Sequence, residues 1–220
     1  FSDREEANFV AETINILKKN YEYKQITILM RTNAQSRIIE DTFTNKGIPY
    51  QILGGIKFYE RKEIKDILAY IKVAINHYDR VSLFRIINTP ARGIGKATID
   101  EIEKISFQKN LSFFDTIKNC IEEKLLSLRA ASILQDFLLL LESLSKKIKE
   151  SKPSEVVEWL IKTISYQDYL ESQNDPNKES RIENIWQLVS ALKEFEEKEG
   201  SNFESFLEKQ ALQSDQDELN

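Results

Sequence analysis

Two kinds of sequence pattern meet in the stretch GGIKFYERKEIKDILAYIK, which covers residues 54–72. Before its two glycines, short apolar runs alternate with helical segments. After them, apolar residues recur at the spacing of a single helix face: Ile64, Ile67, Leu68, Ile71 and Ile75. The helical pattern then continues almost without interruption. We therefore predict a domain boundary near residue 58 and a fold that is mainly α.

The segment before this boundary has the pattern of a small, incomplete α/β unit. The short β-branched run Ile26–Met30 is typical of a buried strand. A helix is expected over Ser36–Asn45, closed by Gly47, and a second strand over Tyr50–Leu53. Two strands are too few to bury both faces of a parallel sheet. We therefore expect this segment to belong to a larger sheet.

The segment after the boundary is predicted to be an all-helical domain. Three further apolar stripes are interpreted as core-facing helix faces: Ile133, Phe137, Leu141, Leu144 and Ile148; Val156, Val157, Leu160, Ile161 and Ile164; Ile182, Ile185, Trp186, Val189 and Leu192. Helix breaks are expected at Pro153 and in the polar stretch Ser172–Ser180.

Composition indicates an ordinary soluble chain. It has 220 residues, of which 41% are hydrophobic and 30% charged. Cys120 is the single cysteine, which excludes an internal disulfide, and no apolar run reaches the ~18 residues of a membrane span. We expect a reduced, cytoplasmic protein. The sequence opens at Phe1 without a methionine or signal pattern, which suggests an excised fragment, although processing could give the same start.

Charge is unevenly distributed along the chain. The formal net charge is −5, and residues 194–220 hold nine acidic and two basic side chains, a net of −7, so the remaining residues carry +2. Between Arg85 and Lys96 there are three basic residues and no acidic one. This stretch is a plausible contact for phosphates in a chain that is not basic overall.

Catalytic chemistry is mostly missing from the sequence. There is no glycine-rich phosphate loop ending in Gly-Lys-Ser or Gly-Lys-Thr. His77 is the single histidine, and with one cysteine it cannot assemble a zinc site; we expect it in a solvated loop. The carboxylates lie near lysines at helical spacing, as in solvated ion pairs. We predict no catalytic, cofactor-binding or metal-binding residue in this chain.

The sharpest local motif is TPARGIGK, residues 89–96, between helices expected over Ser82–Asn88 and from about Ala97 to Ser106. It has the signature of a helix-hairpin-helix, in which Gly93 and Gly95 allow a tight turn and Ile94 fills the angle between the helices. The second helix would point unpaired N–H groups at a DNA phosphate, with Arg92 and Lys96 as counter-charge. The alternative is a plain pair of helices with a glycine turn.

A second candidate is MRTNAQSR, residues 30–37, which follows the first expected strand. Ligands of α/β sheets usually bind at the carboxyl ends of strands. Arg31 and Arg37 could pair with phosphates, and Thr32 and Asn33 could hydrogen-bond to sugar, base or backbone. The alternative is a helix capped by Asn33 with two surface arginines.

Three stretches, in order and spacing, resemble the middle of bacterial UvrD/PcrA/Rep-type helicases of superfamily one. They are RTNAQSR at 31–37, IPYQILGGIKFYERKEIKDILAYIK at 48–72 and RIINTPARGIG at 85–95. The likeness is strongest over residues 26–106 and continues more weakly to the acidic ending at 214–218. An ordered match of this length is more specific than any one of its motifs.

The resemblance implies two RecA-like motor domains, 1A and 2A, each interrupted by a helical subdomain, 1B and 2B. Residues 1–57 would be the leading part of 2A, and residues 58–220 most or all of 2B. ATP and Mg²⁺ would be bound by the full-length parent, outside this stretch, so the fragment alone is expected to hold no cofactor and to be inactive.

The family's DNA contacts carry over to both motifs. By resemblance, Arg31 and Asn33, with Thr32 between them, touch single-stranded DNA. The duplex-gripping hairpin corresponds to Thr89, Arg92, Gly93, Ile94, Gly95 and Lys96. Phe58 and Arg61 are expected to support packing and hinge geometry at the junction of 2A and 2B.

The resemblance implies an ATP-dependent DNA helicase of 3′ to 5′ sense, acting in bacterial repair or replication. Its partners would be a DNA single strand and duplex junction, together with domains 1A, 1B and the rest of 2A. Two alternatives are a stand-alone helix-hairpin-helix module that binds DNA or recruits a partner, and an inactive helicase-like scaffold.

Overall fold

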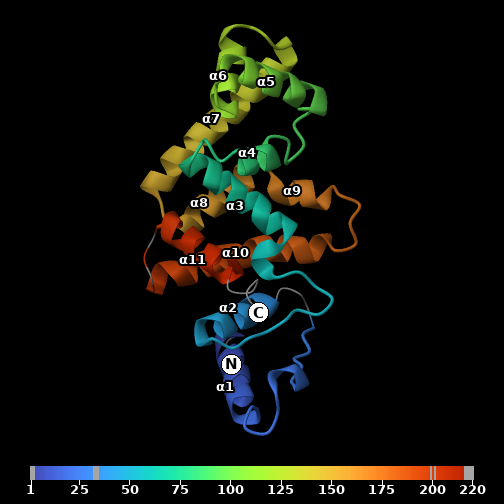
Figure 1. The fold of residues 1–220 in the computed structure, drawn as a ribbon, viewed down its shortest axis with the longest axis vertical. Helices are drawn as coiled ribbons and strands as arrows, with labels where there is room; N and C mark the ends of the chain where they lie inside the picture. Colours follow the sequence, from blue (N-terminus) through green and yellow to red (C-terminus); the bar gives the residue numbers. More distant parts are fainter. Residues whose placement is uncertain (1–2, 32–34, 199, 201, 216–220) are drawn as a thin grey trace.

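The computed structural model describes residues 3–31, 35–198, 200 and 202–215, and within these residues every regular element is a helix. In chain order the elements are α1 (Asp3–Leu17), η1 (Tyr23–Gln25), α2 (Ser36–Lys46), η3 (Phe58–Glu60), α3 (Lys62–Ile75), α4 (Arg80–Ile86), α5 (Lys96–Lys109), α6 (Phe113–Glu122), α7 (Leu128–Glu150), α8 (Pro153–Thr163), α9 (Tyr166–Glu171), α10 (Lys178–Lys198) and α11 (Phe203–Asp215). The prediction of a mainly α chain is confirmed. The molecule is elongated, with α1 and α2 at one end and α5 and α6 at the other (Figure 1).

The helical part is built around α3. Ten of its fourteen residues are buried, because α4, α7, α8 and α10 all pack against it. The predicted stripe is confirmed for Ile64, Ile67, Leu68 and Ile71, whereas Ile75 is 37% exposed at the end of the helix. The long helix α7 connects the end formed by α5 and α6 to the rest of this part (Figure 1).

Helix boundaries in this part follow local capping chemistry. Asp79, Ser112 and Ser127 each accept a backbone N–H in the first turn of the helix that follows, which satisfies a donor that the helix itself leaves unpaired. Pro153 occupies the first turn of α8, where its missing N–H costs nothing. The expected break at Pro153 is therefore confirmed.

The N-terminal part packs α1 against α2 over a small core of its own, made of Ala11, Ile14, Phe43 and Ile48. The predicted helix is confirmed as α2, and Gly47 ends it in the left-handed conformation with φ of 64°. This small core is separate from the main one, which extends from Phe58 to Phe206.

The two strands predicted in the N-terminal part do not form. Residues 26–30 and 50–53 have no ladder partner within the described chain, and Leu29 and Leu53 are 92% and 78% exposed. The two segments line a shared cavity of about 310 Å³ instead of pairing with each other. A strand is stabilised by its neighbours, so an apolar β-branched run without a paired neighbour stays irregular.

Candidate nucleic-acid interface

Between α4 and α5 lies a turn of residues 88–95, here called the glycine turn. The side-chain oxygen of Asn88 accepts hydrogen bonds from the backbone N–H groups of Arg92 (2.8 Å), Gly93 (3.1 Å) and Ile94 (3.3 Å). One amide oxygen thus satisfies three successive donors. These three N–H groups are therefore occupied inside the protein, by a residue, Asn88, that no sequence motif had marked as functional.

The two glycines of the turn serve different purposes. Gly93 has φ of +86°, which a residue with a side chain adopts only at a cost. Gly95 has φ of −84° and ψ of 168°, which suits any residue, and a Cβ built there meets no heavy atom within 4 Å. Ile94 is 2% exposed and belongs to the main core. The turn is anchored at Ile94 and open to solvent at Gly95.

Arg92 points into the protein. Its guanidinium donates to the carbonyl oxygens of Ile86 (2.9 Å) and Pro90 (3.1 Å) and to the hydroxyl of Tyr70, and it lies over the rings of Tyr70 and Phe137. These contacts do not fit the expected role of Arg92 as counter-charge for a phosphate. The physical reason is that two carbonyls, a hydroxyl and two aromatic faces around the turn already hold the guanidinium.

Tyr70 connects the turn to α3. Burial raises the pKa of its hydroxyl to about 12, against the lowering effect of Arg92, so the group stays protonated. It donates to the carbonyl oxygen of Thr89 at 2.7 Å. Thr89, another expected DNA contact, is half-buried and held through its backbone.

Arg85, the first basic residue of this stretch, is also paired inside the protein. Arg85 pairs with the buried carboxylate of Asp66 at 2.7 Å, and Tyr166 donates to the other oxygen of the same carboxylate. Lys96 is exposed and has no hydrogen-bond or ion-pair partner among the residues that the structure describes. Of the basic run between Arg85 and Lys96, Lys96 alone is therefore presented to solvent without a partner within the described chain.

Helix α5 begins at Lys96 without a side-chain cap and without an acidic residue in its first turn. The N–H groups of Lys96, Ala97 and Thr98 have no acceptor within the described part of the chain. Unpaired donors and the positive end of the helix dipole favour an anion here. The start of α5 is the part of this motif with free hydrogen-bonding capacity.

The second predicted site lies in part outside the described residues. Thr32 and Asn33 fall there, so their placement carries no argument. Arg31 is exposed, and its backbone N–H donates to Gln35 at 3.0 Å. The N-cap of α2 is Gln35 rather than Asn33.

Arg37, expected at a DNA phosphate, is 1% exposed. Its guanidinium donates to Asp41 (3.2 Å), to Gln187 (3.1 Å) and to Glu194 (2.8 Å), and the last two residues belong to α10. A buried arginine with three partners cannot reach a nucleic acid. Arg37 therefore joins α2 to α10 of the helical part.

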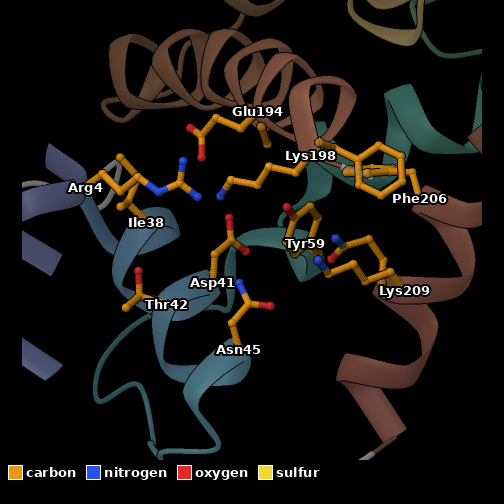
Figure 2. Close-up of a pocket in the computed structure, with 13 residues that line it drawn as sticks. Arg4, Ile38, Asp41, Thr42, Asn45, Tyr59, Glu194, Lys198, Phe206 and Lys209 are labelled. Carbon is orange, nitrogen blue, oxygen red and sulfur yellow. The ribbon is translucent and has the colours of Figure 1, made fainter. Parts of the chain in front are cut away.

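Beside Arg37 lies a small polar pocket of about 70 Å³. Figure 2 shows Arg4 and Lys198 entering it from opposite sides, between the carboxylates of Asp41 and Glu194. Burial raises the pKa of Asp41 to about 6, although the Arg37 charge opposes this. Ligand pockets usually exceed roughly 300 Å³, so this pocket is too small for a nucleotide.

Arg61 is the second arginine at this junction and is 8% exposed. It donates to Asn184 of α10 (2.6 Å), to Ser36 of α2 (2.6 Å) and to the carbonyl oxygen of Ile56 (3.3 Å). Phe58, beneath its guanidinium, is fully buried. The burial of Arg61 and Phe58 agrees with the packing role expected for them.

The remaining chemistry is sparse. His77 is half-buried, stacked on Phe114 with 4.4 Å between ring centroids and hydrogen-bonded to the carbonyl oxygen of Val73, so it is less solvated than expected. In the described residues, no three His, Cys, Asp or Glu side chains gather as a metal site requires. None of the described helices has the length and apolar character needed to cross a membrane.

Comparisons with known proteins agree with the expected family. The profile of the family described as UvrD-like helicase C-terminal domain matches residues 1–220. The chain is 37% identical over 221 residues to a Staphylococcus aureus (strain Mu50) protein named ATP-dependent DNA helicase PcrA, and 36% identical to the protein of that name in Staphylococcus epidermidis. Each match covers 99% of this chain but 30% of the relative. This chain belongs to the UvrD-like helicase C-terminal domain family.

Proposed function

We propose that this chain is part of an ATP-dependent DNA helicase that moves 3′ to 5′ along one strand in bacterial DNA repair or replication. Family membership and the relatives' name, ATP-dependent DNA helicase, support the helicase assignment, whereas the direction and the setting follow from the motif resemblance alone. ATP and Mg²⁺ would bind to other parts of the parent protein, because the phosphate loop is not in this sequence. The parent would act in the cytoplasm.

In this proposal residues 1–57 are the leading part of motor domain 2A and residues 58–220 are subdomain 2B. The separation of the small N-terminal core from the main core supports a boundary at this place. Arg31, Thr32 and Asn33 would contact the single strand. Arg37 is not included among these contacts, because it is buried against α10.

The start of α5 is the observation that carries the role proposed for the helical part. We assign α4, the glycine turn and α5 to a helix-hairpin-helix that binds the backbone of duplex DNA. The free N–H groups of Lys96, Ala97 and Thr98 would donate to a phosphate, and Gly95 leaves room for its close approach. Contacts of this type do not read base sequence, so binding is expected to be nonspecific.

Gly95→Val tests this role. The backbone at Gly95 accepts a β-branched residue and a Cβ there meets no heavy atom within 4 Å, so the free energy of unfolding should change by no more than about 1 kcal/mol. The methyl groups would stand where the phosphate approaches. Duplex affinity should then fall at least about tenfold, since one or more charge-assisted hydrogen bonds are lost.

The measurement is fluorescence anisotropy of a labelled blunt duplex titrated with the 220-residue chain at low ionic strength. Lys104→Ala is the matched control, because Lys104 is an exposed lysine of α5 two turns from its start and has no partner among the described residues. Equal binding by Gly95→Val and the unmodified chain would show that the glycine turn is structural and that the duplex contact lies elsewhere.

A further inference from the structure

An arginine distant in the sequence lies against the glycine turn. A Cβ built on Gly93 would be 3.6 Å from Nη2 of Arg129 and 4.0 Å from Cδ1 of Ile133, both in the first two turns of α7. The long connection through α5 and α6 thus returns the chain to the turn. No spacing or motif in the sequence links residue 129 to residue 93.

Arg129 differs from the other arginines near the turn in having no partner among the described residues. Arg80 pairs with Glu103, Arg85 pairs with Asp66, and Arg92 is held by carbonyls and aromatic rings. Arg129 is exposed and makes no hydrogen bond or ion pair with any residue that the structure describes. Its guanidinium keeps its hydrogen-bond donors available on the same side of the molecule as Gly93.

The position of Arg129 is also unfavourable for its own helix. It is the second residue of α7, and cations near a helix N-terminus oppose the helix dipole. No acidic residue lies in the first turn of α7 or of α5, whereas α3, α6 and α8 each have one there. Two helix N-termini and two cations, Lys96 and Arg129, therefore flank the glycine turn, and neither cation is paired with an anion among the described residues.

We infer that Arg129 is a further phosphate-binding residue of this surface and supplies, together with Lys96, the counter-charge that Arg92 does not provide. The inference rests on the duplex contact proposed above. A guanidinium can donate two parallel hydrogen bonds to one phosphate, so Arg129 would bind the DNA backbone beside the phosphate held by the start of α5. The ligand class is a polyanionic nucleic-acid backbone, read without base contacts.

The test compares duplex binding by Arg129→Ala, Arg129→Lys, Lys104→Ala and Gly95→Val as the salt concentration is raised. Loss of one phosphate contact lowers the slope of log affinity against log salt by about 0.9. Arg129→Ala should show this change and a loss of affinity of about five- to tenfold at moderate salt. Arg129→Lys should keep the slope, because it keeps the charge, and Lys104→Ala should bind as the unmodified chain does.

Unfolding by urea separates a binding role from a structural one. Arg129 has no partner within the described chain, so Arg129→Ala should unfold at the same urea concentration as the unmodified chain. Unchanged affinity and slope in Arg129→Ala, with binding lost in Gly95→Val, would overturn the inference and leave the proposed function standing. If neither variant alters binding, the proposed duplex contact at the start of α5 is wrong, and so is the role proposed for Arg129.

Discussion

At the residue scale, the guanidinium of Arg92 acts as an internal support for the glycine turn. It lies over two aromatic rings and donates to two carbonyl oxygens and a hydroxyl. Hydrogen bonds from a charged group contribute more than neutral ones, and buried acceptors left without a donor are costly. Arg92 and Asn88 therefore hold the shape of the turn, whereas Lys96 and Arg129 place positive charge beside it, facing solvent.

Arg92→Ala is expected to destabilise the chain by about 1–3 kcal/mol, because it leaves the carbonyls of Ile86 and Pro90 without their donor. Arg92→Lys should not restore stability, since one ammonium cannot reach both carbonyls and stack on the rings. Urea unfolding measures the effect, with Lys104→Ala as control. A variant as stable as the unmodified chain but with a lower salt slope would make Arg92 a phosphate contact after all.

Asp41 makes stability depend on pH. Burial raises its pKa to about 6, with Glu194 and Glu40 adding to the shift and Arg37 opposing it. The folded chain thus binds a proton that the unfolded chain has released between about pH 4 and pH 6. The resulting stability is fully present below the unfolded pKa and is lost as pH rises through 6.

Asp41→Asn should therefore be more stable than the unmodified chain above pH 6, by about 1–2 kcal/mol after allowance for the partial exposure of the side chain. The difference should shrink as pH falls from 6 toward 4. Urea unfolding at pH 8 and at pH 4.5 measures it, with the exposed Asp136→Asn as control. A pH-independent difference, or a loss of stability at pH 8, would show that the ion pair with Arg37 dominates.

The candidate site was predictable only in part at this scale. The glycine signature identifies the turn and the backbone conformation of Gly93, and the burial of Ile94 follows from its place between two helices. It does not identify which arginine faces outward, because Arg85, Arg92 and Arg37 find partners in distant segments. Arg129 lacks any local signal, since only tertiary packing brings α7 to the turn.

At the element scale, helices were predictable and strands were not. The apolar stripes of α3, α7, α8 and α10 pack into the core of the same chain. The spacing of their apolar residues therefore predicts these helices directly. The runs at 26–30 and 50–53 have strand composition but no neighbour to pair with in the described residues. Pairing is a property of two segments, and a single segment's pattern cannot supply it.

Hydrogen exchange should reflect this difference. Amides in 27–30 and 50–53 have no backbone acceptor among the described residues and are expected to exchange nearly as fast as in an unfolded chain. Amides of α3 and the buried half of α7 should exchange orders of magnitude more slowly. Mass spectrometry of peptic peptides distinguishes them, with α2 as an internal reference from the same small core. Equal protection of both groups would mean that the two runs do pair in solution.

At the scale of the whole molecule, two apolar cores are joined through a polar junction. Arg37 and Arg61 cross from the N-terminal part and its connection to α10 of the helical part. The carboxylate of Glu40, 6% exposed, accepts from the backbone N–H of Phe58 and lies 3.9 Å from Arg61. Polar junctions of this kind hold parts in place by a few directional contacts rather than by a shared core.

Arg61→Ala should therefore uncouple the two parts. The substitution leaves Ser36 and Asn184 without their hydrogen-bond donor and Glu40 without its nearby cation. Breaking a buried charge pair typically lowers the free energy of unfolding by about 3–5 kcal/mol. Because the main core does not depend on this contact, the cost should fall on α1 and α2. Limited proteolysis should cut them faster in Arg61→Ala, while α3 to α10 stay protected.

Two further variants serve as controls for this prediction. Arg61→Lys should behave like the alanine variant, since an ammonium cannot span the separate acceptors, and the exposed neighbour Lys62→Ala should behave like the unmodified chain. If Arg61→Ala instead exposes both parts to protease at the same rate, the chain unfolds as one cooperative unit and the junction is not a separable connection.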